Sequence, residues 1–234
     1  KRILLLRPDG VGDVVLFSAS TPFYRELFPT AHIVLLVMDR TGNVVEHCPL
    51  VDEVWLLQRR KFRFNPFERW RWCWKLASHG FDLAINTVYS TNYRHLDCLI
   101  GWTRAPRRLA HQCLDSVARR DRTSPYFTEL VPAHQEWKFE IDRNHDMLRH
   151  LGYSGEANHK TRIWINKSDG GSVPTFLEPF KGEHYAVLAP GSADKKRIWD
   201  TNDFVSSIKQ IQQDYPLQWI VDGNAGDYER CNYI

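Results

Sequence analysis

Short apolar runs alternate with longer amphipathic stretches in the first half of the chain. Residues 3–6 are continuously apolar, which is typical of a strand buried on both faces of a parallel sheet. The same pattern predicts strands at residues 32–37, 53–57 and 82–86. Helices are predicted at residues 13–28, with a kink or a break at Pro22, and at 41–47, 66–79 and 137–151, the last ending at Gly152. Strands and helices in this order predict parallel pairing through right-handed crossovers.

The pattern restarts after a polar segment, residues 167–174, whose glycines and proline are typical of an exposed linker. A strand at 185–189, a turn at Pro190-Gly191-Ser192, a helix at 201–214 and a strand at 218–222 follow. We therefore predict an α/β chain with an N-terminal Rossmann-like domain at 1–166, a linker at 167–183 and a second Rossmann-like domain at 184–234. That second domain has a single strand-helix-strand unit, so we expect a truncated domain in a fragment that is inactive alone.

Composition changes this picture little. A chain of 234 residues with 43% hydrophobic residues can bury a core without disulfides or metals. Five cysteines without a C-x-x-C pair, and scattered histidines, indicate a reducing, cytoplasmic location and no metal site. No apolar run approaches the roughly 20 residues that a membrane-spanning helix needs.

Charged residues are unevenly distributed along the chain, although the net charge is only +3. Residues 59–75 hold seven Lys or Arg against one acid, Glu68, and interleave them with aromatics: Phe62, Phe64, Phe67, Trp70, Trp72 and Trp74. One interpretation is a surface that sits on an anionic membrane and receives a phosphorylated lipid acceptor. The other is an amphipathic helix whose aromatics face the core. Both stay open. A nucleic-acid surface has the same ingredients, but the two-domain pattern argues against it.

The candidate chemistry lies in the loop after the first strand, Arg7-Pro-Asp-Gly-Val-Gly-Asp13. Ligands of open α/β sheets bind at the carboxyl ends of strands. Gly10 and Gly12 allow a sharp turn and a close approach to a ligand. A dinucleotide fingerprint would need glycine where Val15 stands. Asp13 is either the N-cap of the following helix or a catalytic carboxylate.

Residues 3–16, with Pro22 and Phe28-Pro29 after them, resemble the opening of glycosyltransferase family 9, the lipopolysaccharide heptosyltransferases. Residues 49–54 are similar to the segment that follows in that family, and so is Pro190-Gly191-Ser192 with Arg197 two positions before Trp199. The resemblance implies a GT-B fold of two Rossmann-like domains. It also implies inverting, metal-independent transfer of a heptose from ADP-heptose to an anionic acceptor of the lipopolysaccharide inner core, in the cytoplasm or at the inner membrane, without a cofactor or nucleic acid.

By its position in the motif, Asp13 corresponds to the general base of the family. The loop around it is expected to bind the acceptor through Arg7, Asp9, Gly10 and Gly12. The donor is expected to contact Gly191, Ser192, Lys196, Arg197 and Asp227. The family usually carries Lys where Arg197 stands, so Lys196 and Arg197 both remain candidates for the diphosphate, and Asp227 is either a donor contact or a helix cap.

Two alternatives to this function remain. One is a glycosyltransferase that uses another nucleotide sugar or another surface glycan. The other is a non-catalytic Rossmann-like module that binds a nucleotide.

Overall fold

The computed structural model describes residues 1–89, 96–112, 124–132, 139–164, 180, 184–192 and 194–234. The chain forms two compact units, Lys1–Asn166 (unit 1) and Lys167–Ile234 (unit 2). The division falls where the change in composition predicts the end of the first domain. Apart from residue 180, the predicted linker at 167–183 lies outside the described residues.

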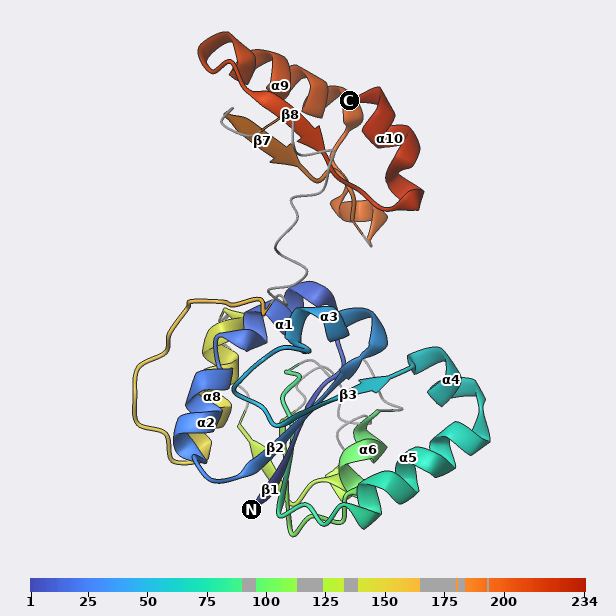
Figure 1. Ribbon diagram of the computed structural model, residues 1–234, viewed down its shortest axis with the longest axis vertical. Coiled ribbons are helices and arrows are strands. Elements are labelled where there is room, and N and C mark those ends of the chain that lie inside the picture. Colours follow the sequence, from blue (N-terminus) through green and yellow to red (C-terminus); the bar gives the residue numbers. More distant parts are fainter. Residues whose placement is uncertain (90–95, 113–123, 133–138, 165–179, 181–183, 193) are drawn as a thin grey trace. The chain divides into compact units, whose positions relative to one another are not determined.

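Unit 1 is built on a six-stranded parallel sheet of order β3-β2-β1-β4-β5-β6 (Figure 1). The strands are β1 (Arg2–Arg7), β2 (His32–Met38), β3 (Glu53–Leu57), β4 (Leu83–Asn86), β5 (Arg107–His111) and β6 (Glu129–Val131). The predicted α/β fold class is confirmed, and the first four strands match the apolar runs. Strands β5 and β6 were not predicted, because β5 opens with two arginines and β6 has only three residues. The strand order reverses between β1 and β4, which makes this the topological switch point of the sheet.

The helices of unit 1 lie on both faces of the sheet. They are α1 (Val11–Ser18), α2 (Thr21–Leu27), α3 (Gly42–Val45), α4 (Arg59–Phe64), α5 (Pro66–Ser78), α6 (Asp97–Trp102) and α8 (Glu140–His150), with 3-10 turns η1 (Asp39–Thr41) and η2 (Ser124–Tyr126). The helix predicted at 13–28 is two helices, and Pro22 lies in the first turn of α2, where its missing N–H is not needed. The prediction that the 137–151 helix ends at Gly152 is confirmed: this glycine has a φ of 100°.

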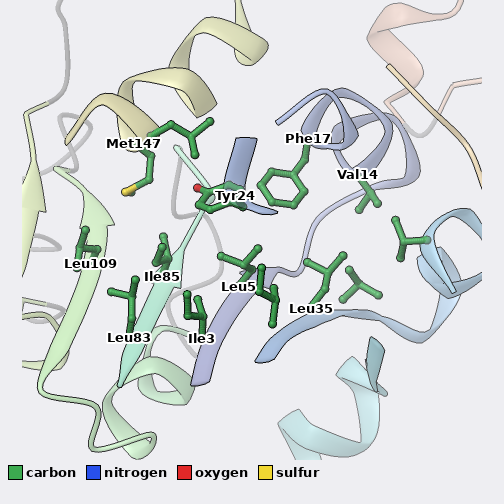
Figure 2. Packing of buried hydrophobic residues seen from close by; sticks show 14 of the residues in the cluster. Ile3, Leu5, Val14, Phe17, Tyr24, Leu35, Leu83, Ile85, Leu109 and Met147 are labelled. Carbon is green, nitrogen blue, oxygen red and sulfur yellow. The ribbon is translucent and has the colours of Figure 1, made fainter. Parts of the chain in front are cut away.

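Two apolar clusters hold these layers together. Successive residues of a strand point to opposite faces, so Ile3 and Leu5 belong to one cluster and Leu4 and Leu6 to the other. Figure 2 shows the first cluster, in which Val14 and Phe17 of α1, Tyr24 of α2 and Met147 of α8 pack over β1, β2, β4 and β5. The second cluster packs Phe62, Trp72, Leu76 and Leu99, from α4 to α6, on the other face.

Unit 2 contains a parallel strand pair, β7 (Tyr185–Leu188) and β8 (Gln218–Val221). Helices α9 (Thr201–Asp214) and α10 (Tyr228–Tyr233) and the 3-10 turns η4 (Lys195–Arg197) and η5 (Ala225–Asp227) complete its described part. No residue of α9 is buried, and Tyr185 and Val187 of β7 are exposed. The described residues of unit 2 therefore share little core.

Neither unit contains, in its described part, a helix with the length and apolar character of a membrane span. The four cysteines that lie in this part, Cys48, Cys73, Cys98 and Cys231, are free thiols.

Candidate functional site

Arg7, the last residue of β1, is fully buried at the switch point, with 0% of its surface exposed. Its Nη1 donates to the carbonyl oxygen of Thr87 at 2.8 Å and to Oδ1 of Asn144 at 3.1 Å. Its Nη2 donates to Oε1 of Glu140 at 2.9 Å, and its Nε lies 3.1 Å from Oδ1 of Asp9. A buried guanidinium between two carboxylates has its charge compensated inside the protein. Arg7 therefore joins β1, β4 and α8 to the loop after β1, instead of being presented to an acceptor as the sequence predicted.

Asp9 is also buried, with 6% of its surface exposed. Burial raises the pKa of its carboxyl group to about 6; Arg7 opposes this shift, and the charges of Asp13 and Glu140 add to it. Asp9 thus belongs to the internal charge network, whereas the sequence predicted a direct acceptor contact.

Asp13 lies in the first turn of α1, and its side chain is exposed. Gly10 occupies the N-cap position, so the interpretation of Asp13 as the N-cap is wrong. Among the residues that the structure describes, none makes a hydrogen bond or an ion pair with the Asp13 carboxylate. It is therefore available to a ligand at the switch point, although an acid in the first turn also suits the helix dipole.

Gly10 and Gly12 leave space around Asp13. Gly10 has a φ of −73°, and neither glycine has a positive φ, so the turn does not depend on the left-handed conformation that glycine permits. A Cβ at Gly10 would lie 3.3 Å from Oδ2 of Asp13. A Cβ at Gly12 would meet nothing within 4 Å, so this exposed backbone is open to an approaching molecule.

Three side chains that the sequence analysis missed lie close to this network. Tyr89 follows β4, and the guanidinium carbon of Arg143 lies 4.1 Å from the centroid of its ring. The ring of His111, at the carboxyl end of β5, lies 5.2 Å from that of Tyr89. Burial lowers the pKa of His111 to about 4, so its imidazole is neutral at pH 7. Only Tyr89 had a signal in the sequence, because it follows a predicted strand.

Unit 2 has a cavity of about 680 Å³ at the carboxyl ends of β7 and β8 and the N-terminus of α9. Its lining residues are Ser192, Ile198, Trp199, Asp200, Thr201, Asn224, Gly226, Asp227 and Arg230. Two of the predicted donor residues, Ser192 and Asp227, are among them. Gly191 packs beside Asp227, since a Cβ at Gly191 would lie 2.8 Å from Oδ1 of that carboxylate.

The carboxylate of Asp227 is bonded on both sides. Its Oδ2 accepts the backbone N–H of Asn224 at 3.2 Å, which completes a capping box, and Nη1 of Arg230 lies 3.2 Å from its Oδ1. Asp227 is therefore the third residue of a capping box whose N-cap is Asn224. It also occupies the N-cap position of α10, but its side chain makes no capping hydrogen bond to that helix. The structure adds Arg230, three residues further on, as a cation in the wall of the cavity.

Lys196 and Arg197 lie in η4, beside the cavity in sequence but not among its described lining residues. The backbone N–H of Lys196 donates to Oδ1 of Asp194 at 3.0 Å. The side chain of Arg197 is 79% exposed, and its Nε is 4.0 Å from Oδ2 of Asp194. Either cation would have to reach toward the cavity, whereas Arg230 is already there.

One group of side chains outside these sites has the composition of a metal site, although none was predicted. His32, Glu53 and His79 offer ligand atoms that all lie within 4.8 Å of one another. Both carboxylate oxygens of Glu53 are already engaged, by Nε2 of His32 at 2.8 Å and by Nε1 of Trp55 at 2.7 Å. The positive charges of Arg2 and Lys75 also act on His79, which disfavours a bound cation. The group is therefore a hydrogen-bonded network around Glu53.

The strand order of unit 1, with a polar loop at its switch point, defines a doubly wound, Rossmann-like architecture. No protein family profile matches the chain, and no curated protein matches it in sequence. Solved structures match its fold. The glycosyl transferase family 9 protein from Veillonella parvula DSM 2008 has a TM-score of 0.74 and 17% identity, over 99% of this chain and 65% of that one.

Two further structures come from E. coli. ADP-heptose LPS heptosyltransferase II has a TM-score of 0.71 and 15% identity, over 99% of this chain and 67% of that one. Heptosyltransferase WaaC with ADP has a TM-score of 0.69 and 14% identity, over 98% of this chain and 69% of that one. The chain thus spans about two thirds of each of these proteins. The predicted resemblance to glycosyltransferase family 9 is confirmed as a likeness of fold, of the GT-B type.

Proposed function

We propose that the protein is a glycosyltransferase that uses Asp13 as its general base. The observation that carries the proposal is the exposed carboxylate of Asp13 at the switch point of unit 1, which has no partner among the described residues. Asp13 follows directly on a loop that the buried Arg7 and Asp9 hold in place. In solved proteins of this fold, the same kind of edge binds ligands.

In the proposed reaction, an acceptor hydroxyl attacks the anomeric carbon of the donor sugar. The new C–O bond forms as the bond to the diphosphate oxygen breaks, so the configuration is inverted. Asp13 accepts the proton of the hydroxyl, and the nucleoside diphosphate leaves with the electron pair of the broken bond. A positioned carboxylate lowers the barrier of such a step by removing the proton as the nucleophile attacks.

The cavity of unit 2 is the proposed donor site. Arg230 and the N-terminus of α9, where Thr201 lines the cavity, offer positive charge and N–H groups to a diphosphate. Ser192 and Asp227 also line the cavity, and Gly191 packs beside Asp227. Lys196 and Arg197 remain candidates from η4. Protein cations at this position would stabilise the leaving group without a metal.

ADP-heptose is the proposed donor, because one of the similar E. coli proteins is an ADP-heptose LPS heptosyltransferase and the other, WaaC, has been solved with ADP and with ADP-2-deoxy-2-fluoro heptose. The proposed acceptor is an anionic sugar of the lipopolysaccharide inner core on the cytoplasmic face of the inner membrane. The excess of Lys and Arg on α4 and α5 supports an anionic acceptor. Another nucleotide sugar or surface glycan remains the alternative.

The test is transfer of labelled heptose from ADP-heptose to the heptose-free inner core by the full-length protein, with the anomeric configuration of the product read by NMR. We expect the parent to transfer heptose with inversion and Asp13→Asn to do so roughly 10²–10⁴-fold more slowly. Transfer with retained configuration would contradict the direct displacement. A non-catalytic nucleotide-binding module, which the cavity around Arg230 would also suit, predicts ADP-heptose binding without any transfer.

A further inference from the structure

The outer face of α4 and α5 carries four large aromatic side chains in solvent. Phe64, Phe67, Trp70 and Trp74 are 71%, 80%, 69% and 65% exposed. Positions 67, 70 and 74 follow the i, i+3, i+7 spacing of one helix face. Trp72 and Leu76 lie on the opposite face of α5 and are buried. Trp72 therefore faces the core, as the second interpretation of this stretch predicted, whereas Phe64, Phe67, Trp70 and Trp74 face solvent, as a surface role would require.

The packing of the inner faces of α4 and α5 keeps these four aromatic side chains in solvent. Trp72 packs against Trp55, with ring centroids 6.1 Å apart, and Nζ of Lys75 lies 3.5 Å from the centroid of the Trp55 ring. Phe62 of α4 is buried against Trp102, with ring centroids 5.9 Å apart. With the inner face filled, the exposed rings have no room in the core.

Single exposed aromatic residues are ordinary, but a contiguous apolar patch marks an interaction surface. Pro66, Phe67 and Trp70 line an apolar hollow of about 390 Å³ in this face. Three exposed cations, Arg60, Lys61 and Arg63, lie on α4, directly before this segment of the chain. The nearby acid Glu68 is paired with Arg71 at 2.6 Å, which leaves the face with an excess of positive charge.

Aromatic rings mixed with Lys and Arg are the chemistry of the bilayer interface. Trp rings prefer the headgroup region, and cations close to the surface are attracted to anionic lipids. We propose that the face formed by Phe64, Phe67, Trp70, Trp74 and the cations of α4, here called the docking face, binds the surface of an anionic bilayer.

The docking face is well placed to serve the candidate site. Helix α4 begins two residues after β3 ends, so it lies at the same edge of the parallel sheet as the loop that carries Asp13. Helix α5 then runs back toward the start of β4 (Figure 1). A bilayer on this face brings a lipid-anchored acceptor to the edge that carries Asp13. This last step rests on the proposed function, whereas bilayer binding does not.

The test is co-sedimentation of the full-length protein with vesicles of phosphatidylcholine, with and without phosphatidylglycerol. The combined change Phe67→Ser, Trp70→Ser and Trp74→Ser should weaken binding to the anionic vesicles at least about tenfold, at low and at high salt. The combined change Arg60→Ser, Lys61→Ser and Arg63→Ser should weaken it at low salt only, because salt screens exposed charges. All six side chains lie on the surface, so circular dichroism should remain unchanged.

Matched controls distinguish vesicle binding through the docking face from nonspecific vesicle binding by exposed aromatic or cationic residues elsewhere. Tyr215→Ser removes an exposed aromatic side chain of unit 2, and Lys160→Ser with Lys209→Ser removes two exposed cations elsewhere. Both controls should bind vesicles as the parent does. Undiminished binding by the triple aromatic variant would overturn the proposal, and so would equal binding to vesicles with and without phosphatidylglycerol. Self-association that the aromatic changes abolish, without any vesicle binding by the parent, would assign the face to a second copy instead.

The result of the vesicle-binding experiment can be distinguished from the result of the heptose-transfer experiment that tests the proposed function. Asp13→Asn should bind vesicles normally, since Asp13 is not on the docking face. The triple aromatic variant should still bind ADP. Vesicle binding without heptose transfer would count against the proposed function alone.

Discussion

The Nε atom of Arg7 lies 3.1 Å from Oδ1 of Asp9, inside the protein and directly before the loop that leads to Asp13. Glu140, from α8, lies 2.9 Å from the other end of the same guanidinium. The position of the proposed base therefore depends on a network of ion pairs that joins residues far apart in sequence.

Arg7→Met should lower the free energy of unfolding of unit 1 by about 3–5 kcal/mol, because it leaves two carboxylates near a buried position without their cation. Urea denaturation followed by tryptophan fluorescence measures this. Adding Asp9→Asn to Arg7→Met should recover part of the loss, since one of the unpaired charges is gone. Arg149→Met, at an exposed arginine of α8, is the control and should change little. A loss below about 1 kcal/mol for Arg7→Met would mean that the network is not stabilising.

Asp9 should impose a pH dependence on stability. Its pKa rises from the ordinary value of 3.8 to about 6 on folding, so the folded state holds the proton more tightly than the unfolded state. The resulting stabilisation is complete below about pH 4 and is lost as the pH rises through about 6. The amide introduced by Asp9→Asn does not titrate, so the variant should gain roughly 1–3 kcal/mol relative to the parent between pH 4 and pH 7. Parallel denaturation curves across this range provide the measurement, and a constant difference would contradict the raised pKa.

Asp13→Asn in the full-length protein should lower turnover by roughly 10²–10⁴-fold, because an amide cannot accept the proton of the acceptor. Thermal stability should hardly change, since Asp13 neither caps α1 nor bonds to a described residue. Asp39→Asn, an exposed acid that opens η1 at the end of β2, is the matched control and should retain turnover. Near-normal turnover of Asp13→Asn would remove Asp13 from the chemistry.

Arg230→Gln should weaken ADP binding about 10- to 100-fold, the effect of losing one charge-assisted hydrogen bond to a phosphate. Arg197→Gln and Lys196→Gln, changed one at a time, should weaken it less, because neither residue lines the described cavity. Isothermal titration calorimetry of the three variants shows which of the three cations contributes most to the affinity for ADP. A larger effect at Lys196 or Arg197 would show that η4 moves to the phosphates and that Arg230 serves to hold Asp227.

The general position of the candidate site could be predicted from the sequence, but the role of each residue could not. The loop with Arg7 and Asp13 follows a recognisable apolar strand, and ligands bind where such strands end. The three side chains near the Arg7 network that the sequence analysis missed, Tyr89, His111 and Arg143, come from three separate segments. Arg230 was missed for a similar reason: its importance comes from contact with Asp227 in a folded cavity.

The sequence by itself determined the first four strands of the chain, the break near Pro22 and the end of α8 at Gly152. The strands follow from continuous apolar runs, the break from the missing backbone N–H of Pro22, and the helix end from the positive φ that Gly152 can adopt. All three are properties of a short segment of the chain. Only the tertiary structure decided that Arg7 is internal, that Asp13 is exposed, and that Trp72 faces the core while Trp70 and Trp74 face solvent. The physical reason is that a side chain's partners come from distant segments. A charged or aromatic residue has the same local pattern whether a carboxylate, another ring or water lies opposite it.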